Sequence, residues 1–234
     1  MNKPRHIAII PDGNRRWAIK NRLPVSMGHK KGVDAFREVM ETSYDIGITC
    51  LSFWGASLAN FTKRPKREVR LLEALYEENF KKLVEDEDIH KKQVRVRVLG
   101  EWETVLGDRA RQAIRLAIDS TKQYSCFSLN FLIAYDGTTE MVIAIENIIR
   151  KAHLNPEIKI TPELIKENLY TRDIPPVDLL IRTGGEPHLS AGFMMWDIAD
   201  VQLYFSDKYW PEFGGDDLKK AVNEYHNRGR RFGR

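Results

Sequence analysis

HIAIIPDGNRRW, residues 6–17, decides the fold expected for this chain, because an apolar run there ends in a polar turn. The run is typical of a short strand, and Pro-Asp-Gly-Asn favours a turn after it. Similar β-rich runs recur, separated by stretches with apolar residues at helical spacing, at residues 48–54, 94–98, 127–134 and 178–181. This alternation predicts an α/β fold with a mostly parallel central sheet of about six strands and helices on both faces. No internal repeat or linker interrupts the pattern, so we expect one domain over residues 1–234.

The composition is that of an ordinary soluble protein, with 42% hydrophobic and 30% charged residues. Its net charge of +4 suits an anionic substrate or a membrane surface. No run of about 18 apolar residues is present and the first residues do not resemble a signal peptide, so we expect a cytoplasmic protein, at most peripheral at a membrane. The basic residues around positions 91–97 lack interleaved stacking aromatics, which argues against nucleic acid as a partner. Cys50 and Cys126 lie in apolar stretches, and we expect both to be buried.

Three segments combine glycine and arginine with a polar or acidic residue, at residues 12–17, 182–186 and 228–234. Ligands of open α/β sheets bind at the carboxyl ends of the strands, where the first two segments are expected. Glycine lets backbone N–H groups approach an anion, and arginine binds phosphate oxygens in a bidentate manner. Asp12 has the wrong charge for a phosphate unless a divalent cation lies between them, as Mg²⁺ does. The residues alone therefore predict a phosphorylated ligand bound with Mg²⁺.

Each of these segments also suits an ordinary structural role. An Asp-Gly-Asn sequence is common in turns, a Gly-Gly pair after a strand often makes a sharp corner, and a basic tail is usually solvated. Their occurrence together on one α/β chain favours the binding site. The Walker A and G-x-G-x-x-G patterns are absent, so neither a P-loop nucleotidase nor a dinucleotide enzyme is supported.

The same segments resemble the signature motifs of the cis-prenyltransferases, the family of undecaprenyl diphosphate synthase. The matching stretches occur in the family's order: HIAIIPDGNRRW at 6–17, DLLIRTGGE at 178–186, LYFSDKYWPEF at 203–213 and RGRRFG at 228–233. The resemblance runs from about residue 5 to the end of the chain. It implies a Mg²⁺-dependent enzyme, a homodimer with an apolar tunnel, that condenses isopentenyl diphosphate with an allylic diphosphate to give a polyprenyl diphosphate. Farnesyl diphosphate is the allylic substrate we expect, and product release implies peripheral contact with a membrane.

The resemblance also implies roles for individual residues. Asp12 would be the catalytic aspartate and Mg²⁺ ligand, and Asn60 the proton acceptor. The allylic diphosphate would be bound around the first motif, by Gly13, Asn14, Arg15, Arg16, Trp17 and His29. A further motif at residues 57–64 would supply Ser57, Phe61 and Arg64. The isopentenyl diphosphate site would be formed by residues after the second motif and in the tail, which could come from the partner subunit: Arg182, His188, Ser190, Arg231 and Gly233.

The chain departs from the family's pattern mainly on the isopentenyl side. His188 stands where arginine is common, and neutral histidine binds phosphate more weakly. Gln202 stands where a glutamate would be the second Mg²⁺ ligand, and an amide adds no negative charge. The motif at 57–64 also carries one extra residue. These departures keep two alternatives open, a non-catalytic accessory subunit and an irregular short-chain isoprenyl condensing enzyme on the same fold.

The helix predicted from residue 66 carries apolar residues on more than one face, among them Leu71, Leu72 and Leu75. In the family this helix and the one beginning near His29 wall the tunnel. Ordinary core packing would explain the same pattern, so the sequence leaves both interpretations open.

Overall fold

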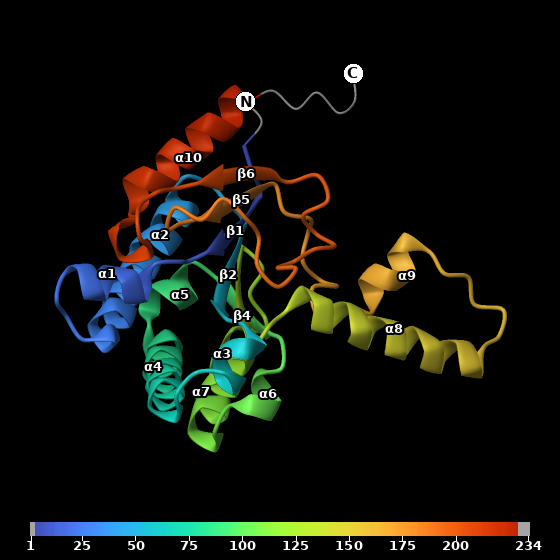
Figure 1. Cartoon of the computed structure of the whole chain (residues 1–234). Coiled ribbons are helices and arrows are strands. Elements are labelled where there is room, and N and C mark those ends of the chain that lie inside the picture. Colours follow the sequence, from blue (N-terminus) through green and yellow to red (C-terminus); the bar gives the residue numbers. More distant parts are fainter. Residues whose placement is uncertain (1–2, 229–234) are drawn as a thin grey trace.

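A computed structural model describes residues 3–228 and places six strands in one sheet, in the order β3-β4-β2-β1-β5-β6. Every neighbouring pair of strands is parallel. The strands are β1 (His6–Ile10), β2 (Cys50–Ala56), β3 (Val94–Leu99), β4 (Phe127–Ile133), β5 (Leu179–Arg182) and β6 (Gln202–Phe205). The predicted α/β fold is thus confirmed, and the carboxyl ends of all these strands lie along one edge of the sheet (Figure 1).

The helices follow the amphipathic stretches of the sequence. They are α1 (Asn14–Lys20), α2 (Val25–Asp45), α3 (Leu58–Thr62), α4 (Lys66–Glu85), α5 (Glu87–Lys91), α6 (Trp102–Val105), α7 (Asp108–Thr121), α8 (Gly137–Leu154), α9 (Pro162–Glu167) and α10 (Gly215–Asn227), with a short 3-10 turn η1 (Trp210–Glu212). The helix predicted over residues 66–88 ends early because the Asp86 side chain accepts a hydrogen bond from the Asp88 N–H and starts α5. Thr161 caps α9 in the same way, by accepting from the Leu164 N–H at 3.2 Å.

One face of the sheet is covered by helices. α2, α10 and η1 pack over β1, β2 and β5 around Phe36, Leu51 and Trp210. α4, α6 and α7 cover β3 and the end of β4 around Phe80 and Ile114. These two clusters hold most of the buried apolar side chains, so this face carries the main core.

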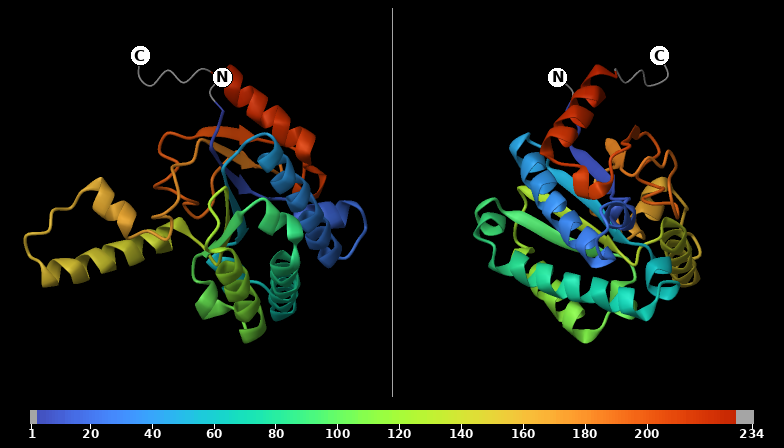
Figure 2. Two further views of the ribbon diagram at one scale, coloured as in Figure 1. Left: turned by 180° about the vertical axis from the view of Figure 1, so that it is seen from behind. Right: turned by 60° about the vertical axis from the view of Figure 1, so that its left-hand side comes forward.

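The opposite face is covered mainly by the connection from β5 to β6, residues 183–201, which we call the crossover loop. It contains no helix, because glycine and proline recur along it, yet Phe193 and Met194 within it are fully buried against β2 and β4. The start of α8 lies beside this loop, and the rest of α8 leaves the body with α9 as a projecting arm (Figures 1 and 2). Helices therefore lie on both sides of the sheet, but unequally.

Two local predictions fail for identifiable reasons. The turn predicted at residues 11–14 becomes the start of α1, because Gly13 adopts a left-handed φ of 111° and the chain turns directly into a helix. Cys50 is buried as expected, but Cys126 is exposed, because it lies in the turn before β4, where its Sγ contacts Gln93. Within residues 3–228, no helix is both long and apolar enough to span a bilayer.

Candidate functional site

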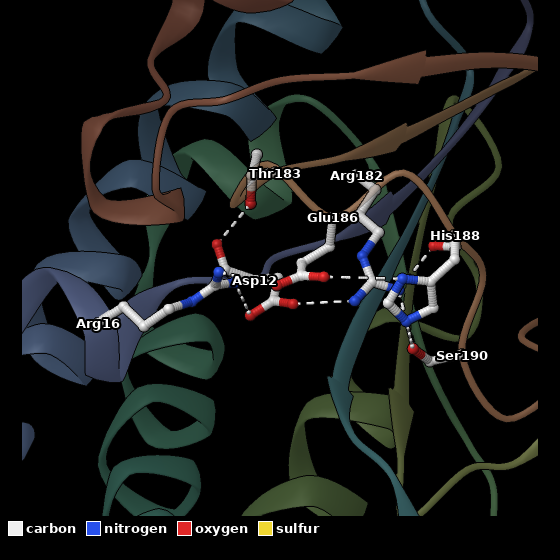
Figure 3. Close-up of polar contacts among 7 residues, drawn as sticks. All are labelled: Asp12, Arg16, Arg182, Thr183, Glu186, His188 and Ser190. Atoms are coloured by element: carbon white, nitrogen blue, oxygen red, sulfur yellow. Dashed lines mark hydrogen bonds and ion pairs between the residues drawn. The ribbon is translucent and has the colours of Figure 1, made fainter.

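An ion pair joins the ends of two neighbouring strands. Arg182 is the last residue of β5 and is paired in register with Ile10, the last residue of β1. Its Nη2 donates to the Asp12 Oδ2 at 2.9 Å, and the Arg16 Nη2 lies 3.0 Å from the Asp12 Oδ1, so both carboxylate oxygens meet a guanidinium (Figure 3). The Arg182 side chain is only 5% exposed, whereas that of Asp12 is 33% exposed. The carboxylate is therefore the more accessible partner.

The crossover loop folds back onto the same arginine. The Arg182 Nη1 donates to the His188 carbonyl oxygen at 2.7 Å and to the Ser190 Oγ at 2.8 Å. The Thr183 hydroxyl donates to the backbone carbonyl of Asp12 at 2.8 Å. The His188 imidazole is exposed, and its Nε2 lies 3.4 Å from the Ser190 Oγ (Figure 3). Arg182, His188 and Ser190, which the sequence places in the isopentenyl diphosphate site, thus lie together.

The residues assigned to the allylic diphosphate surround Asp12 on the other side. The Asn14 Oδ1 and the His29 Nε2 are buried without a hydrogen-bond partner, and both residues line a cavity that begins at Asp12. Arg15 is exposed, with its Nη1 3.9 Å from a Glu68 carboxylate oxygen. Orphaned polar atoms facing a cavity are expected where a polar ligand completes the site.

The motif at residues 57–64 contributes to the same mouth. Ser57, Asn60 and Arg64 line the cavity. The Asn60 Oδ1 accepts a hydrogen bond from the Ser57 N–H at 3.2 Å, which fixes the amide at the start of α3. Arg64 forms an ion pair with Glu68, four residues later, in which the Arg64 Nη1 lies 2.8 Å from the Glu68 Oε1.

Several predicted residues do not line the cavity itself: Gly13, Arg15, Arg16, Trp17, Phe61 and His188. Phe61 packs instead against the core beneath α4 and α7, and Trp17 is half-buried on α1. Arg231 and Gly233 lie outside the described residues.

The cavity has a volume of about 470 Å³ and runs between α2 and α4. Its mouth is polar, at Asp12 and Arg182, and its far end reaches Glu41 and Asp86. Between them the wall is mainly apolar, formed by Val33, Phe36, Met40, Leu72, Leu75 and Phe80. The apolar residues on several faces of α4 therefore serve both purposes left open by the sequence, since some pack in the core and others line the cavity.

Gln202 is not brought to Asp12 within the chain. It begins β6 in register with Leu179, which is itself in register with Ile7, whereas Asp12 follows the opposite end of β1. The Gln202 Nε2 donates to the Arg228 carbonyl oxygen at 3.3 Å. A single chain therefore does not supply Gln202 as a ligand beside Asp12, and residues 3–228 hold no cluster of three or more metal-binding His, Cys, Asp or Glu side chains.

The histidine at the mouth is neutral at physiological pH. Burial, together with the nearby Arg64, lowers the pKa of His29 to about 4. A neutral imidazole can donate or accept a hydrogen bond at a diphosphate but adds no charge. The positive charge of the mouth therefore comes from arginines.

Sequence reasoning missed several side chains that organise the site. Glu186 accepts a hydrogen bond from the Arg16 Nη1 at 3.0 Å, and the Arg16 guanidinium lies 5.4 Å from the centre of the Tyr209 ring. Glu68 binds both Arg15 and Arg64. The spacing of Arg64 and Glu68 is a helical ion-pair signal that the sequence did contain. The contacts of Glu186 and Tyr209 join distant segments, so no local pattern predicts them.

Comparison with known proteins agrees with the geometry. Residues 10–233 match the family model described as "Putative undecaprenyl diphosphate synthase". The chain belongs to the undecaprenyl diphosphate synthase family. It is therefore an enzyme that transfers prenyl groups, as the sequence resemblance implies.

Relatives in this family are similar over nearly their whole length. A protein from Thermococcus kodakarensis is 41% identical, covering 100% of this chain and 88% of the relative, and one from Methanocaldococcus jannaschii is 40% identical, covering 100% and 84%. Both are named tritrans,polycis-undecaprenyl-diphosphate synthase (geranylgeranyl-diphosphate specific).

Two solved structures share the fold. Lavandulyl diphosphate synthase from Lavandula x intermedia, in complex with dimethylallyl diphosphate, has a TM-score of 0.93 and 31% identity over 99% of both chains. A probable undecaprenyl diphosphate synthase from Campylobacter jejuni has a TM-score of 0.80 and 28% identity over 100% of both chains.

The buried histidines predict how stability depends on pH. The pKa values of His6 and His29 both fall from 6.5 to about 4 on burial, so between these values the unfolded chain binds more protons than the folded one. Stability should therefore rise with pH from about 4 to 6.5. Between pH 7 and 4, the free energy of unfolding should fall by about 2 kcal/mol less in a His29→Asn variant than in the wild type. Urea denaturation at a series of pH values measures this.

The matched control is His153→Asn, which removes an exposed imidazole. A His29→Asn variant with the same pH dependence as the wild type would show that folding leaves the pKa of His29 near its ordinary value.

Proposed function

We propose that this chain joins isopentenyl diphosphate to an allylic diphosphate, forming cis double bonds and releasing pyrophosphate. The observation that carries the proposal is the cavity, which has a charged mouth at Asp12, Arg16 and Arg182 and an apolar body between α2 and α4. A diphosphate suits arginines and orphaned polar atoms, and an isoprenoid chain suits an apolar cavity, since each buried CH₂ contributes about 0.8 kcal/mol. The two chemistries of the substrate are thus separated along one cavity.

Two sets of residues are proposed to hold the two diphosphates. Arg182, His188 and Ser190 would bind isopentenyl diphosphate, and Asn14, Arg16 and His29 would lie against the allylic diphosphate, with Gly13, Arg15 and Arg64 beside them. Holding both substrates at one mouth aligns the isopentenyl double bond with the allylic C1 and lowers the entropic part of the barrier. The arginines also stabilise the charge that develops on the departing pyrophosphate. Asn60, fixed by Ser57 at the same mouth, is proposed to accept the proton that leaves.

Asp12 is proposed to hold Mg²⁺. Its carboxylate is 33% exposed at the cavity mouth, and protein Mg²⁺ sites often consist of one or two carboxylates with substrate phosphates and water as the other ligands. The ion would offset the negative charge of the diphosphate. Gln202 does not fit this site within one chain, because it lies at the opposite end of the sheet. Without the ion, Arg16 and Arg182 hold the carboxylate in place.

We propose geranylgeranyl diphosphate as the allylic substrate, in place of the farnesyl diphosphate expected from the sequence. The support is the naming of relatives that are 37–41% identical over nearly the whole chain, each called geranylgeranyl-diphosphate specific. A polyprenyl product is strongly apolar, so we further propose that it is released at a membrane surface.

The second candidate is condensation of short substrates, which the TM-score of 0.93 with lavandulyl diphosphate synthase favours. The cavity argues for the longer product, because it continues past the mouth to Asp86 at the end of α4. An accessory subunit without activity is less well supported, since Asp12, Arg16 and Arg182 all retain their contacts.

Product analysis tests these candidates. Purified chain is incubated with labelled isopentenyl diphosphate and either geranylgeranyl, farnesyl or dimethylallyl diphosphate, with Mg²⁺ or EDTA. We expect Mg²⁺-dependent products with several added C5 units, formed fastest from geranylgeranyl diphosphate. Faster reaction with farnesyl diphosphate would overturn the proposed primer. A single condensation of dimethylallyl diphosphate would support the short-chain enzyme, and no product from any primer in a folded sample would support the accessory subunit.

The projecting arm is proposed as the surface where a second copy of the chain packs. Val142, Ile145 and Ile149 of α8 are 57%, 52% and 51% exposed, at a spacing that puts them on one side of the helix. Arg95 and Arg97 on the edge strand β3 are only half-buried, so the loop-covered face of the sheet is partly open there. An apolar stripe on an arm that leaves the body is typical of an interface (Figure 2).

Replacing Ile145 with Glu should convert the proposed homodimer to a monomer, because the charge would be desolvated at the interface. Sedimentation equilibrium measures the mass. The matched control is Leu116→Glu on α7, where Leu116 is 58% exposed and lies away from the arm. A monomeric wild type, or an Ile145→Glu variant that remains dimeric, would contradict this surface.

A further inference from the structure

The crossover loop is held in a strained backbone conformation beside the site. Ala191 and Met194 have φ values of 49° and 48°, in the left-handed region that L-residues with side chains rarely adopt. Strain of this kind persists only where surrounding contacts fix the backbone, and it concentrates near functional sites. Ser190, which accepts the Arg182 hydrogen bond, directly precedes Ala191. The contacts that hold these residues therefore also determine where the Ser190 hydroxyl lies.

Those contacts come from the start of α8 and from the short segment between β4 and α8. The Met194 N–H donates to the Tyr135 hydroxyl at 3.2 Å, and the Gly137 N–H donates to the Ala191 carbonyl oxygen at 2.9 Å. The approach is close enough that a Cβ at Gly137 would lie 1.8 Å from the Gly192 carbonyl oxygen. Phe193 adds a ring stack on Trp54, with centroids 5.0 Å apart. The strained segment is therefore fixed at both of its ends, at Ala191 and at Met194.

Behind Tyr135 stands a buried carboxylate that the cavity does not contain. Glu140 is 1% exposed, and its Oε2 accepts a hydrogen bond from the Tyr135 hydroxyl at 2.5 Å. Its other oxygen accepts from the Thr171 N–H at 3.2 Å. Burial raises the pKa of Glu140, which is the cost of placing a carboxylate there. Buried carboxylates are rare unless they satisfy specific groups, and this one orients the hydroxyl that receives the Met194 N–H.

The other end of the crossover loop is tied to the same region. Asp197 is 3% exposed, forms an ion pair with Lys166, and accepts a hydrogen bond through its carbonyl from the Val177 N–H at 2.9 Å. The Lys166 ammonium also donates to the Thr171 carbonyl oxygen at 2.6 Å. Lys166 and Thr171 therefore link the carboxylates of Asp197 and Glu140 through one short segment. The loop is anchored at its middle and at its end by one polar network.

We propose that Glu140 and Tyr135 are positioning residues for the isopentenyl diphosphate site, acting through Met194 to hold Ser190 against Arg182. The inference rests on the proposed function, because it takes Arg182 and Ser190 as the groups that bind isopentenyl diphosphate. Glu140 and Tyr135 are 1% and 0% exposed and neither lines the cavity, so we place both behind the substrate-binding surface. The allylic side is built on α1 and α2, through Asn14 and His29, and among the described residues no hydrogen bond joins these two side chains to the network.

Because the two sides of the site are held by different contacts, a change in this network should affect the binding of only one substrate. Removing the Tyr135 hydroxyl leaves the Met194 N–H and one oxygen of Glu140 without partners, and the strained segment can then relax. Ser190 would shift, while Asn14 and His29 stay where they are. The affinity for isopentenyl diphosphate should fall, and that for the allylic diphosphate should not.

The test uses Tyr135→Phe, Glu140→Gln and the double variant of the full chain. We expect the KM for isopentenyl diphosphate to rise about tenfold in each single variant, and the KM for geranylgeranyl diphosphate to change less than about twofold. Because the two residues act in series, the double variant should resemble the single ones instead of multiplying their effects. The matched control is Thr121→Val, since Thr121 is also buried and accepts a hydrogen bond from the Val96 N–H at 3.1 Å. It should leave both KM values unchanged.

Equal changes in the two KM values, unchanged values, or multiplicative effects in the double variant would overturn the proposal. Calorimetric titration with isopentenyl diphosphate gives the same comparison as a Kd, without turnover. A wild type that binds isopentenyl diphosphate but does not react would overturn the proposed function alone, and the Kd values would then decide the positioning role. A wild type that does not bind it would overturn both. If Tyr135→Phe does not fold, Gly137→Ala displaces the loop from its other contact and should raise the same KM.

Discussion

The buried guanidinium of Arg182 is the constraint on which the site depends. A charged side chain that is 5% exposed must be paired and hydrogen-bonded, because the energy of desolvating it is large. Its partners are three groups from two segments: the carboxylate of Asp12, and the hydroxyl of Ser190 and the backbone carbonyl of His188 in the crossover loop. The adjacency of β1 and β5 makes the first contact, and the crossover loop makes the others. The order of the strands and the conformation of the crossover loop are therefore both needed to pair the Arg182 guanidinium.

The same arrangement explains how a polar site can stand beside an apolar cavity. The charges of the mouth lie at the ends of strands, on α1 and just before α4, whereas the walls further along α2 and α4 are mainly apolar until Glu41 and Asp86 at the far end. The cavity can hold a hydrocarbon chain only because helix faces that would otherwise meet in the core are kept apart. Undecaprenyl diphosphate synthase-like chemistry needs this division, since its substrates have a charged end and an apolar end.

Sequence reasoning located five of the strands and the main helices because their periodicity is strong. β6 was missed because Gln202 and Tyr204 are only partly buried and Phe205 is exposed, so the segment lacks the apolar run of a central strand. α1 was missed because Gly13 turns a typical turn sequence into a helix start. Most predicted site residues converge at the mouth, because their motifs follow strand ends. The placement of Gln202 could not be foreseen, since it depends on the register of β6 with β5. The roles of Glu186 and Glu140 could not be foreseen either, because they depend on tertiary contacts that no local sequence pattern predicts.

The most direct test of the central claim is the turnover of an Asp12→Asn variant with isopentenyl and geranylgeranyl diphosphates in the presence of Mg²⁺. Circular dichroism establishes that the variant is folded, and Asp216→Asn, whose side chain is 99% exposed, is the control. We predict that Asp12→Asn reduces turnover by about 10²–10⁴-fold, because the neutral amide supplies no negative charge to attract Mg²⁺ or to balance the two arginines, while the control is unaffected. A folded Asp12→Asn variant with turnover within about threefold of the wild type would contradict it.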